Sequence, residues 1–167
     1  SKDHALEDFD INARGTLILL EATLKHCPNA VFVHVSTDKV YGENMNRAVR
    51  EGVKRFYYTR PIGENIGLDF AGQRSLFGCS KLAADVYAQE YANYFDLKVG
   101  VFRPGCITGN KHKGAEEHGF LAYLVKCIKE EKTYRIFGYK GKQVRDQIHA
   151  YDLVNAFYHF SQSPKIG

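Results

Sequence analysis

The sequence lacks the cysteine patterns that signal a metal site or a disulfide framework. Its 167 residues include four cysteines, and no two of them form a C-x-x-C pair. They stand far apart along the chain, at Cys27, Cys79, Cys106 and Cys127. Zinc sites and small disulfide-linked domains both need closely and regularly spaced cysteines. We therefore expect no metal ion and reduced thiols, which favours a cytoplasmic protein.

Long apolar runs and basic blocks are missing as well. No apolar stretch approaches the roughly 20 residues that a membrane helix needs, and the opening SKDHALEDFD has no basic-then-apolar signal pattern. The net charge of +4 is mild, and the 23 lysines and arginines are scattered among 19 acids. A nucleic-acid-binding surface would gather the basic residues into a patch. We expect a soluble chain that binds neither membranes nor nucleic acid.

What the sequence does contain is an alternation of helices and buried strands. Apolar residues recur at helical spacing over 9–27 and again over 75–95. Compact runs rich in β-branched and aromatic residues, typical of strands buried on both faces, cover 30–37 and 97–104. Helix, strand, long loop, helix and strand in this order indicate an α/β fold with a parallel sheet and crossover helices.

The other segments continue this pattern around one long polar stretch. We predict a helix over 119–132, a short strand over 134–137 and a last helix over 150–164. The segment 42–74 is polar, rich in glycine and arginine, and longer than the usual loops of a compact domain. We interpret it as a functional insertion.

Chemistry is expected where the strands end, because open parallel sheets hold ligands at the carboxyl ends of their strands. These ends are STDKVYG at 36–42 and RPGCITGN at 103–110. Ser36 and Thr37 could bind a substrate hydroxyl, and Asp38 could accept a proton. The same residue types also favour turns, so on spacing alone a purely structural role is the default interpretation.

Three charged residues elsewhere are further candidates. Lys81 follows Phe77 by one helical turn and could bind a ribose or lower a neighbouring pKa, although a single helical lysine is usually just solvated. Arg145 could contact a diphosphate, with Asp146 to orient it, or the two could form a weak surface pair. Each residue therefore has both a functional and a structural interpretation.

Five segments in a fixed order resemble the NAD-dependent epimerase/dehydratase family of the extended short-chain dehydrogenase/reductase superfamily. The segments are DFDINARGTLILLEA, VHVSTDKVYG, FGCSKLAADVYAQEYANYF, VGVFRPGCITG and GKQVRDQIHAYDLVNAF. The resemblance implies a Rossmann-type doubly wound parallel sheet with a small substrate-binding lobe. Residues 1–109 would be the second half of the NAD-binding domain, 110–149 the lobe, and 150–167 a helix returning to the core domain.

The resemblance also implies a first half that this sequence does not contain. Family members begin with a strand and a glycine-rich turn that cradles the pyrophosphate of NAD, and SKDHAL resembles a segment that follows the fourth strand. Roughly 80 to 100 residues of a dinucleotide-binding unit would precede it. NAD is the implied cofactor, and the residues that distinguish NAD from NADP would lie in that part.

The resemblance assigns roles to the residues at the strand ends. Thr37 would bind the sugar hydroxyl that is oxidised, with Ser36 beside it in the cofactor site. Lys81 would bind the nicotinamide ribose and favour the ionised form of a nearby acid. A short segment after the second strand would pass close to the nicotinamide ring: Pro104, Gly105, Cys106 and Ile107.

On the substrate side, Arg145 would contact the nucleotide diphosphate and Asn110 would lie in the sugar site. Asn12 would support the site rather than touch substrate. The segments FGCSK, HGFLAYLVKC and FGYKGKQVRDQIH most resemble the CDP-paratose (CDP-tyvelose) 2-epimerase group. The implied reaction oxidises C2 of a CDP-hexose to a transient ketone and returns the hydride to the opposite face. The implied assembly is a homodimer through the helices 9–27 and 76–95.

Phe77 departs from the family pattern, because a tyrosine usually stands here as the base and phenylalanine cannot take a proton. Three interpretations are open. Asp38, Lys81 or Cys106 replaces the base, the chain is a catalytically silent NAD- and nucleotide-sugar-binding regulatory module, or Phe77 is an engineered substitution. The 4,6-dehydratases carry a glutamate where this chain has Lys39, so we do not expect the chain to be an efficient 4,6-dehydratase. Another nucleotide-sugar dehydratase or a reductase of the same family is a further alternative.

Overall fold

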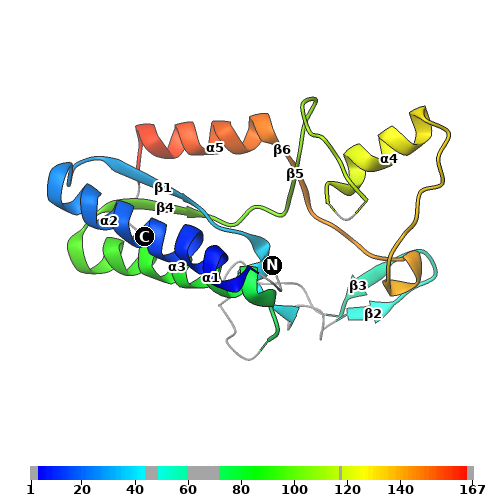
Figure 1. Ribbon diagram of the computed structural model, residues 1–167, viewed down its shortest axis with the longest axis horizontal. Coiled ribbons are helices and arrows are strands. Elements are labelled where there is room, and N and C mark those ends of the chain that lie inside the picture. The colour runs from blue at the N-terminus through cyan, green and yellow to red at the C-terminus, as the bar shows by residue number, and fades with distance from the viewer. Residues whose placement is uncertain (1–3, 44–48, 60–71, 117, 165–167) are drawn as a thin grey trace. The chain divides into compact units, whose positions relative to one another are not determined.

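The computed structural model describes residues 4–43, 49–59, 72–116 and 118–164 of the chain (Figure 1). The chain divides into two compact units, and each unit contains both helices and strands. The first unit comprises residues 1–47, 64–104 and 156–167, and the second comprises 48–63 and 105–155. The domain boundaries expected from the sequence stay a prediction.

The first unit begins with a long helical segment. Helices α1 (Ala5–Asp8) and α2 (Gly15–His26) are joined by a π-helical turn at Phe9–Arg14, so the chain is helical from residue 5 to residue 26. The predicted helix over 9–27 is therefore confirmed, and it begins one turn earlier. Single π-turns inside helices are rare and often occur at functional sites; this one carries Asn12.

Two parallel strands form the sheet of the first unit. Strand β1 (Val31–Val35) runs beside β4 (Lys98–Phe102) in register, and helix α3 (Ser75–Phe95) leads into β4. Figure 1 shows α2 and α3 side by side along this strand pair. The predicted strands and the predicted helix over 75–95 are confirmed. The arrangement is α/β, with the parallel pairing that the alternation of elements predicted.

Strand β1 is less buried than its apolar sequence predicted. Of its five residues only His34 is buried, Val35 is 37% exposed and the others are half-buried. Among the described residues β1 pairs with β4 alone. The burial on both faces that the sequence predicted is not seen in the described part of the chain, where β1 has one neighbouring strand.

The core of the first unit lies between the helices and the sheet. Leu20 of α2 packs with Ala88 and Tyr91 of α3 and with Leu97. Partly buried apolar residues surround them: Leu17, Leu24, Phe32, Val99 and Val101. The Tyr91 hydroxyl donates a hydrogen bond to the Glu21 carboxylate. Burial, together with that carboxylate, raises the pKa of Tyr91 to about 12, so the phenol stays protonated.

Helix α5 (Ala150–Gln162) packs its last turns onto β4. The rings of Phe157 and Phe160 meet the Phe102 ring edge-on, at centroid distances of 4.8 and 5.9 Å. Gly100 makes this approach possible, since a Cβ there would lie 2.5 Å from the Phe160 ring. The predicted helix over 150–164 is confirmed.

The described residues of the second unit form two small sheets and the helix α4 (Phe120–Lys129). Strand β5 (Cys106–Thr108) runs parallel to β6 (Gln147–His149). Strands β2 (Val49–Glu51) and β3 (Phe56–Tyr58) form an antiparallel hairpin. Helix α4 confirms the helix predicted over 119–132.

One expectation for the second unit is wrong. Residues 134–137 form no strand, because they have no ladder partner in the described part of the chain and lead instead into a short turn at Tyr139–Gly141. The segment 42–74 contains the β2–β3 hairpin, and its interpretation as a functional insertion stays a prediction. Its residues 44–48 and 60–71 lie outside the described residues.

Membrane insertion finds no support in the described helices. None of them is at once long enough and apolar enough to cross a bilayer.

Candidate active site

The carboxyl ends of β1 and β4 are held together beyond the last paired residues of the two strands. The backbone N–H of Ser36 donates to the carbonyl of Phe102 at 2.7 Å, and that of Asp38 donates to the carbonyl of Pro104 at 3.2 Å. The structure therefore brings the predicted residues Ser36, Thr37 and Asp38 next to Pro104. This is the edge where a parallel sheet holds its ligands.

Thr37 caps a turn and also forms a hydrogen bond with the neighbouring Asp38 side chain. Thr37 is extended, and its Oγ1 caps the short helical turn Asp38–Tyr41 by accepting a 3.4 Å hydrogen bond from the Lys39 N–H. The Thr37 hydroxyl donates to Asp38 Oδ1 at 3.2 Å, and the Asp38 side chain is exposed. A hydroxyl that reaches Thr37 would thus meet an oxygen already paired with a carboxylate.

Lys81 lies against the end of β1. Its Nζ donates to the carbonyl of Val35 at 2.7 Å, which places the ammonium group beside the Ser36–Asp38 segment. Partial burial lowers the pKa of Lys81 from its ordinary value, and the nearby Asp85 carboxylate opposes this change. The predicted grouping of Thr37 and Lys81 at one edge is therefore present in the structure.

Phe77 lies one turn before Lys81 on α3, and its half-buried ring offers neither donor nor acceptor. Its backbone carbonyl accepts a 2.8 Å hydrogen bond from the Ser80 hydroxyl. Ser80 Oγ in turn accepts a 3.0 Å bond from the Asn12 amide in the π-turn. Asn12 thereby fixes the first turns of α3, in agreement with the supporting role implied for it.

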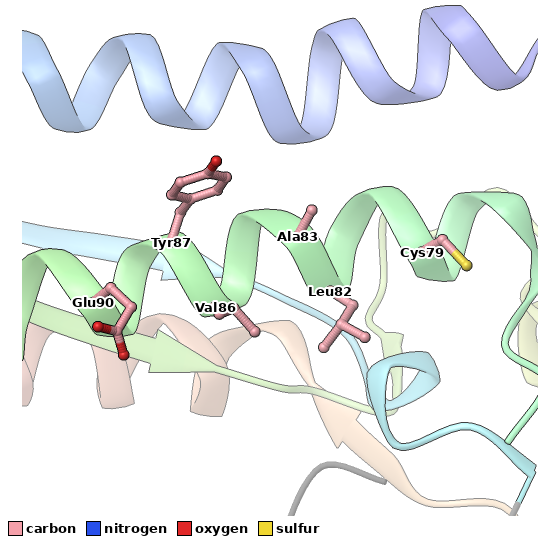
Figure 2. Close-up of a pocket in the computed structure, with 6 residues that line it drawn as sticks. All are labelled: Cys79, Leu82, Ala83, Val86, Tyr87 and Glu90. Carbon is pink, nitrogen blue, oxygen red and sulfur yellow. The ribbon is translucent and has the colours of Figure 1, made fainter. Parts of the chain in front are cut away.

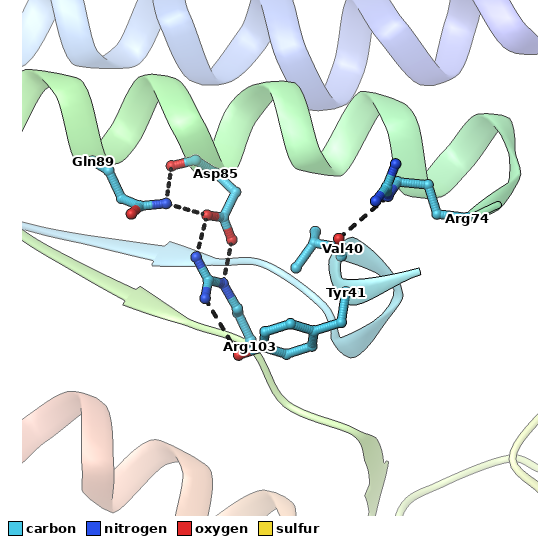
Figure 3. Close-up of polar contacts among 6 residues, drawn as sticks. All are labelled: Val40, Tyr41, Arg74, Asp85, Gln89 and Arg103. Carbon is cyan, nitrogen blue, oxygen red and sulfur yellow. Dashed lines mark hydrogen bonds and ion pairs between the residues drawn. The ribbon is translucent and has the colours of Figure 1, made fainter. Parts of the chain in front are cut away.

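A buried ion pair lies beneath this edge (Figure 3). The Asp85 side chain is fully buried, and Arg103 grips both of its carboxylate oxygens, Nε to Oδ2 at 2.9 Å and Nη2 to Oδ1 at 2.8 Å. The Gln89 amide adds a 2.6 Å hydrogen bond to Oδ1. On the other side, Arg103 Nη1 donates to the Tyr41 hydroxyl at 3.3 Å, and its guanidinium lies 5.2 Å from the Tyr41 ring centroid.

The ion pair controls the charge of both partners. Burial by itself would raise the pKa of Asp85, but the hydrogen bonds and charge of Arg103 and the hydrogen bond from Gln89 outweigh it and hold that pKa below its ordinary value. The Asp85 carboxylate raises the pKa of Arg103 further above its already high value. Both groups therefore stay charged, and their pairing ties α3 to the end of β4 and to the turn that follows Asp38.

A second contact holds the same turn from the N-terminal end of α3. Arg74 Nε donates to the carbonyl of Val40 at 3.3 Å (Figure 3). Val40 itself is fully buried. The last two residues of the turn that Asp38 begins are thus both tied to α3, Val40 directly through Arg74 and Tyr41 through Arg103 and Asp85.

His34 is a buried titratable residue close to the site. It lies in β1, is 6% exposed, and its Nε2 finds no hydrogen-bond partner among the described residues. Burial lowers the pKa of His34 to about 4; the Lys81 cation lowers it further and the Asp85 carboxylate opposes both. The imidazole is therefore neutral at physiological pH.

The remaining predicted site residues belong to the second unit and are placed within it. Gly105 leads into β5, where the Cys106 N–H donates to the carbonyl of Asp146 at 3.2 Å and Ile107 is 39% exposed. Asn110 lies in the turn after β5. Arg145 is exposed, and its Nε donates to the Gln143 side chain at 2.9 Å.

The sequence pattern did not single out the ion pair, although signals for it exist. Asp85 stands four residues after Lys81 on the inner side of an otherwise apolar helix, and Arg103 stands at the end of a buried strand. A buried acid on a helix needs a cation, because unpaired buried charges are costly. Pairing the two from sequence would have required knowing that α3 packs on β4.

A family model described as the NAD dependent epimerase/dehydratase family matches residues 1–167. The chain belongs to this family. CDP-paratose 2-epimerase of Salmonella typhi is 36% identical over 166 residues, which are 95% of this chain and 48% of that protein. The chain spans about half the length of the curated relatives it matches.

Solved structures show the same fold. The dTDP-glucose 4,6-dehydratase of Bacillus anthracis, in complex with NAD, matches with a TM-score of 0.72 and 29% identity over 94% of this chain and 44% of that one. UDP-glucuronic acid 4-epimerase of Bacillus cereus, in complex with UDP-glucuronic acid and NAD, matches with a TM-score of 0.67 and 26% identity over 92% and 42%. The Rossmann-type α/β fold predicted from the sequence is confirmed.

Removing one half of the buried ion pair should strongly destabilise the protein. We expect Asp85→Asn to lower the free energy of unfolding by about 3–5 kcal/mol, because it leaves the Arg103 charge uncompensated. Chemical denaturation measures this change. The matched control is Asp10→Asn, which breaks an exposed 3.7 Å pair with Arg14 and should cost less than about 1 kcal/mol. Equal effects of the two substitutions would contradict the role given to Asp85.

The neutral His34 predicts that stability falls in mild acid. Its pKa is about 4 in the folded chain against an ordinary value of 6.5, so between these values the unfolded chain binds a proton that the folded chain does not. Stability is then complete above pH 6.5 and falls by roughly 2–3 kcal/mol as the pH drops to 4. In His34→Gln, unfolding measured across this range should lose that part of the pH dependence. An unchanged dependence would contradict the assignment.

Proposed function

We propose that the protein to which this chain belongs is an NAD-dependent nucleotide-sugar epimerase that inverts C2 of a CDP-hexose through a transient ketone. The observation that carries the proposal is the grouping of Thr37, Asp38 and Lys81 at the carboxyl end of the strand pair. Its 36% identity with a CDP-paratose 2-epimerase supports the choice of nucleotide and carbon.

The residues present fit an NAD molecule at this edge. Lys81 uses one N–H on the Val35 carbonyl, and an ammonium group has two more to donate to ribose hydroxyls. Partial burial lowers the pKa of Lys81. We propose that Ser36 and Pro104, which the backbone hydrogen bonds of this edge hold in place, lie on the cofactor side of the first unit. Bound NAD+ would supply a hydride acceptor that returns the same hydride later in the turnover.

The Thr37–Asp38 pair supplies a path for the substrate proton without a tyrosine. A sugar hydroxyl that donates to Thr37 Oγ1 can pass its proton to that oxygen while the proton of Thr37 moves to Asp38 Oδ1, 3.2 Å away. Return of the hydride reverses both transfers. The cation of Lys81 favours the negatively charged states along this path. Asp38 is therefore the base we propose, in preference to Lys81 and Cys106.

Phe77 is the reason to consider a second function, that of a catalytically silent binding module. A module that binds NAD and a nucleotide sugar without turning it over would need the same edge and could dispense with a base. The ring of Phe77 cannot exchange a proton, which is the observation that favours this regulatory alternative.

A dehydratase or a reductase is less well supported. The dehydratases eliminate water with an aspartate and a glutamate in succession, and this chain has Asp38 followed by Lys39. The exposed Lys39 side chain provides a cation where that chemistry needs an acid. Similarity to a dTDP-glucose 4,6-dehydratase therefore extends to the fold rather than to this pair.

Arg145 and Asn110 are proposed for the sugar-nucleotide side. Arg145 is exposed, and among the described residues its guanidinium donates to the Gln143 side chain alone, which leaves donors for a diphosphate. Gly105, Cys106 and Ile107 are proposed to lie along the nicotinamide.

We also propose that two copies pair through α3 and the helical segment that precedes β1. Six α3 residues line a groove, five of them without charge: Cys79, Leu82, Ala83, Val86, Tyr87 and Glu90 (Figure 2). Tyr87 is 46% exposed and Tyr94 80%, and on the other helix Ile18 is 56% and Leu19 59% exposed. Apolar surface of this extent on adjacent helices is usually covered by a partner.

The activity test uses the protein expressed from its complete reading frame. Proton NMR of CDP-paratose with NAD+ should show conversion to the C2-inverted sugar. Asp38→Asn should lower kcat by about 10²–10⁴-fold, because the amide keeps the contact to Thr37 but accepts no proton. The matched control Glu43→Gln changes an exposed acid nearby and should leave kcat unchanged.

Either of two outcomes would contradict this assignment. Full activity in Asp38→Asn would exclude Asp38 as the base. No conversion by the unaltered protein, together with tight binding of NAD and CDP-paratose, would favour the silent module, and conversion by Phe77→Tyr would then identify the missing base.

Dimerisation is tested by a charge on the apolar helix face. Tyr87→Lys should convert the dimer to a monomer in light scattering, since it buries an unpaired cation in the interface. The matched control is Tyr158→Lys, which alters a 60% exposed tyrosine on α5, outside the proposed interface. A monomer in the unaltered protein, or a dimer in Tyr87→Lys, would contradict this interface.

A further inference from the structure

The β2–β3 hairpin of the second unit has two chemically different faces. In its antiparallel register Arg50 lies opposite Tyr57, and Glu51 lies opposite Phe56. Successive residues of a strand point to opposite sides. Glu51 and Phe56 therefore share one face, the inner face, and Arg50 and Tyr57 share the other, the outer face.

The inner face is attached to the turn around Tyr139. Glu51 accepts from Lys140 at 2.8 Å and from Lys142 at 2.6 Å, and the Phe56 and Tyr139 rings meet edge-on at 6.2 Å. Hydrogen bonds from both lysines lower the pKa of Glu51 to about 2. The only acid of the hairpin is thus occupied on the inner face.

The outer face presents a tyrosine flanked by two guanidinium groups. The Arg50 and Arg55 guanidiniums lie 5.8 and 5.5 Å from the centroid of the Tyr57 ring. Gly52 makes this packing possible, because a Cβ at Gly52 would lie 2.4 Å from the Tyr57 ring. The ring is thereby fixed over the turn, and it orients both arginines.

The two arginines have no acidic partner in the parts of the chain that the structure describes. Both side chains are exposed, and Tyr57 is 45% exposed. The second unit also concentrates positive charge: residues 48–63 and 105–155 hold thirteen of the chain's 23 lysines and arginines but seven of its 19 acids. Guanidinium groups bind phosphate through paired N–H donors. Fixed and unpaired, they form a surface suited to a phosphorylated ligand.

We propose that Arg50, Arg55 and Tyr57 form a binding surface for the diphosphate of a nucleoside diphosphate. This inference rests on the proposed function, since a nucleotide sugar is the ligand that would bring a diphosphate to the second unit. The hairpin is attached to residues 140–142, a short distance along the chain from Arg145. Arg145 would then be one of several arginines that contact phosphate, and the polar segment 42–74 would act by supplying two of them.

Calorimetric titration of the complete protein with CDP and UDP tests the surface. Arg50→Gln and Arg55→Gln should each weaken binding by about tenfold, which is the effect of losing one charge-assisted contact. The matched control is Lys54→Gln, which removes a neighbouring exposed cation that does not touch Tyr57, and it should change the affinity less than about twofold. Equal affinities in all four proteins, or no binding of either nucleotide, would overturn the proposal.

A second variant separates geometry from charge. Gly52→Ala keeps every charge but displaces the Tyr57 ring, so it should also weaken CDP binding. Circular dichroism of each variant checks that it is folded. Unchanged CDP binding in Gly52→Ala would show that the ring does not orient the arginines and would overturn that part of the proposal.

Two competition experiments identify which phosphate the surface holds. Inorganic pyrophosphate should compete with CDP in the unaltered protein and lose that ability in Arg55→Gln. NAD content, measured on the same preparations, should be equal in all of them; a loss of NAD in the arginine variants would assign the surface to the cofactor and overturn the proposal.

The outcomes also separate this proposal from the epimerase assignment. Arginine-dependent CDP binding without any conversion of CDP-paratose would support the surface and count against the enzyme. Conversion with CDP affinities unaffected by the arginine variants would support the enzyme and overturn the surface.

Discussion

The pair of Asp85 and Arg103 is the interaction on which the candidate site depends. Asp85 lies on α3, four residues after Lys81, and Arg103 immediately precedes Pro104. Arg103 also reaches Tyr41, at the end of the turn that Asp38 begins. One buried contact therefore connects the three segments that carry the proposed chemistry. Breaking such a pair leaves an uncompensated buried charge. We therefore expect the three segments to keep their relative positions only while the pair is intact.

This constraint explains how a site can form without a tyrosine at position 77. The Thr37 hydroxyl donates to the Asp38 side chain, and the backbone N–H of Asp38 donates to the carbonyl of Pro104. Lys81 is fixed by the Val35 carbonyl. A proton path needs donors and acceptors held within hydrogen-bond distance more than it needs one residue type. Thr37 and Asp38 lie within that distance of each other, which is the basis of the path we propose.

Much of the fold could be predicted from the sequence, because α3 and the strands β1 and β4 have strong apolar periodicity and clear ends. The three-residue strands could not, since they are too short to show an alternating pattern and β5 pairs with the distant β6. Residues 134–137 resemble a strand but find no partner in the described part of the chain. Resemblance to the family pointed to Thr37 and Lys81. It did not reveal the ion pair, which depends on the packing of α3 on β4. Nor did it reveal the hairpin surface, because strands of three residues in a polar segment leave no clear alternation in the sequence.

The most direct test of the account follows the hydrogen at C2 of the sugar. CDP-paratose carrying deuterium at C2 is incubated with the complete protein and NAD+, and the inverted product is examined by mass spectrometry and proton NMR. Oxidation at C2 with return of the same hydride predicts that the product keeps its deuterium and forms more slowly than from unlabelled substrate. Loss of the deuterium to water, or inversion at another carbon, would contradict the central claim.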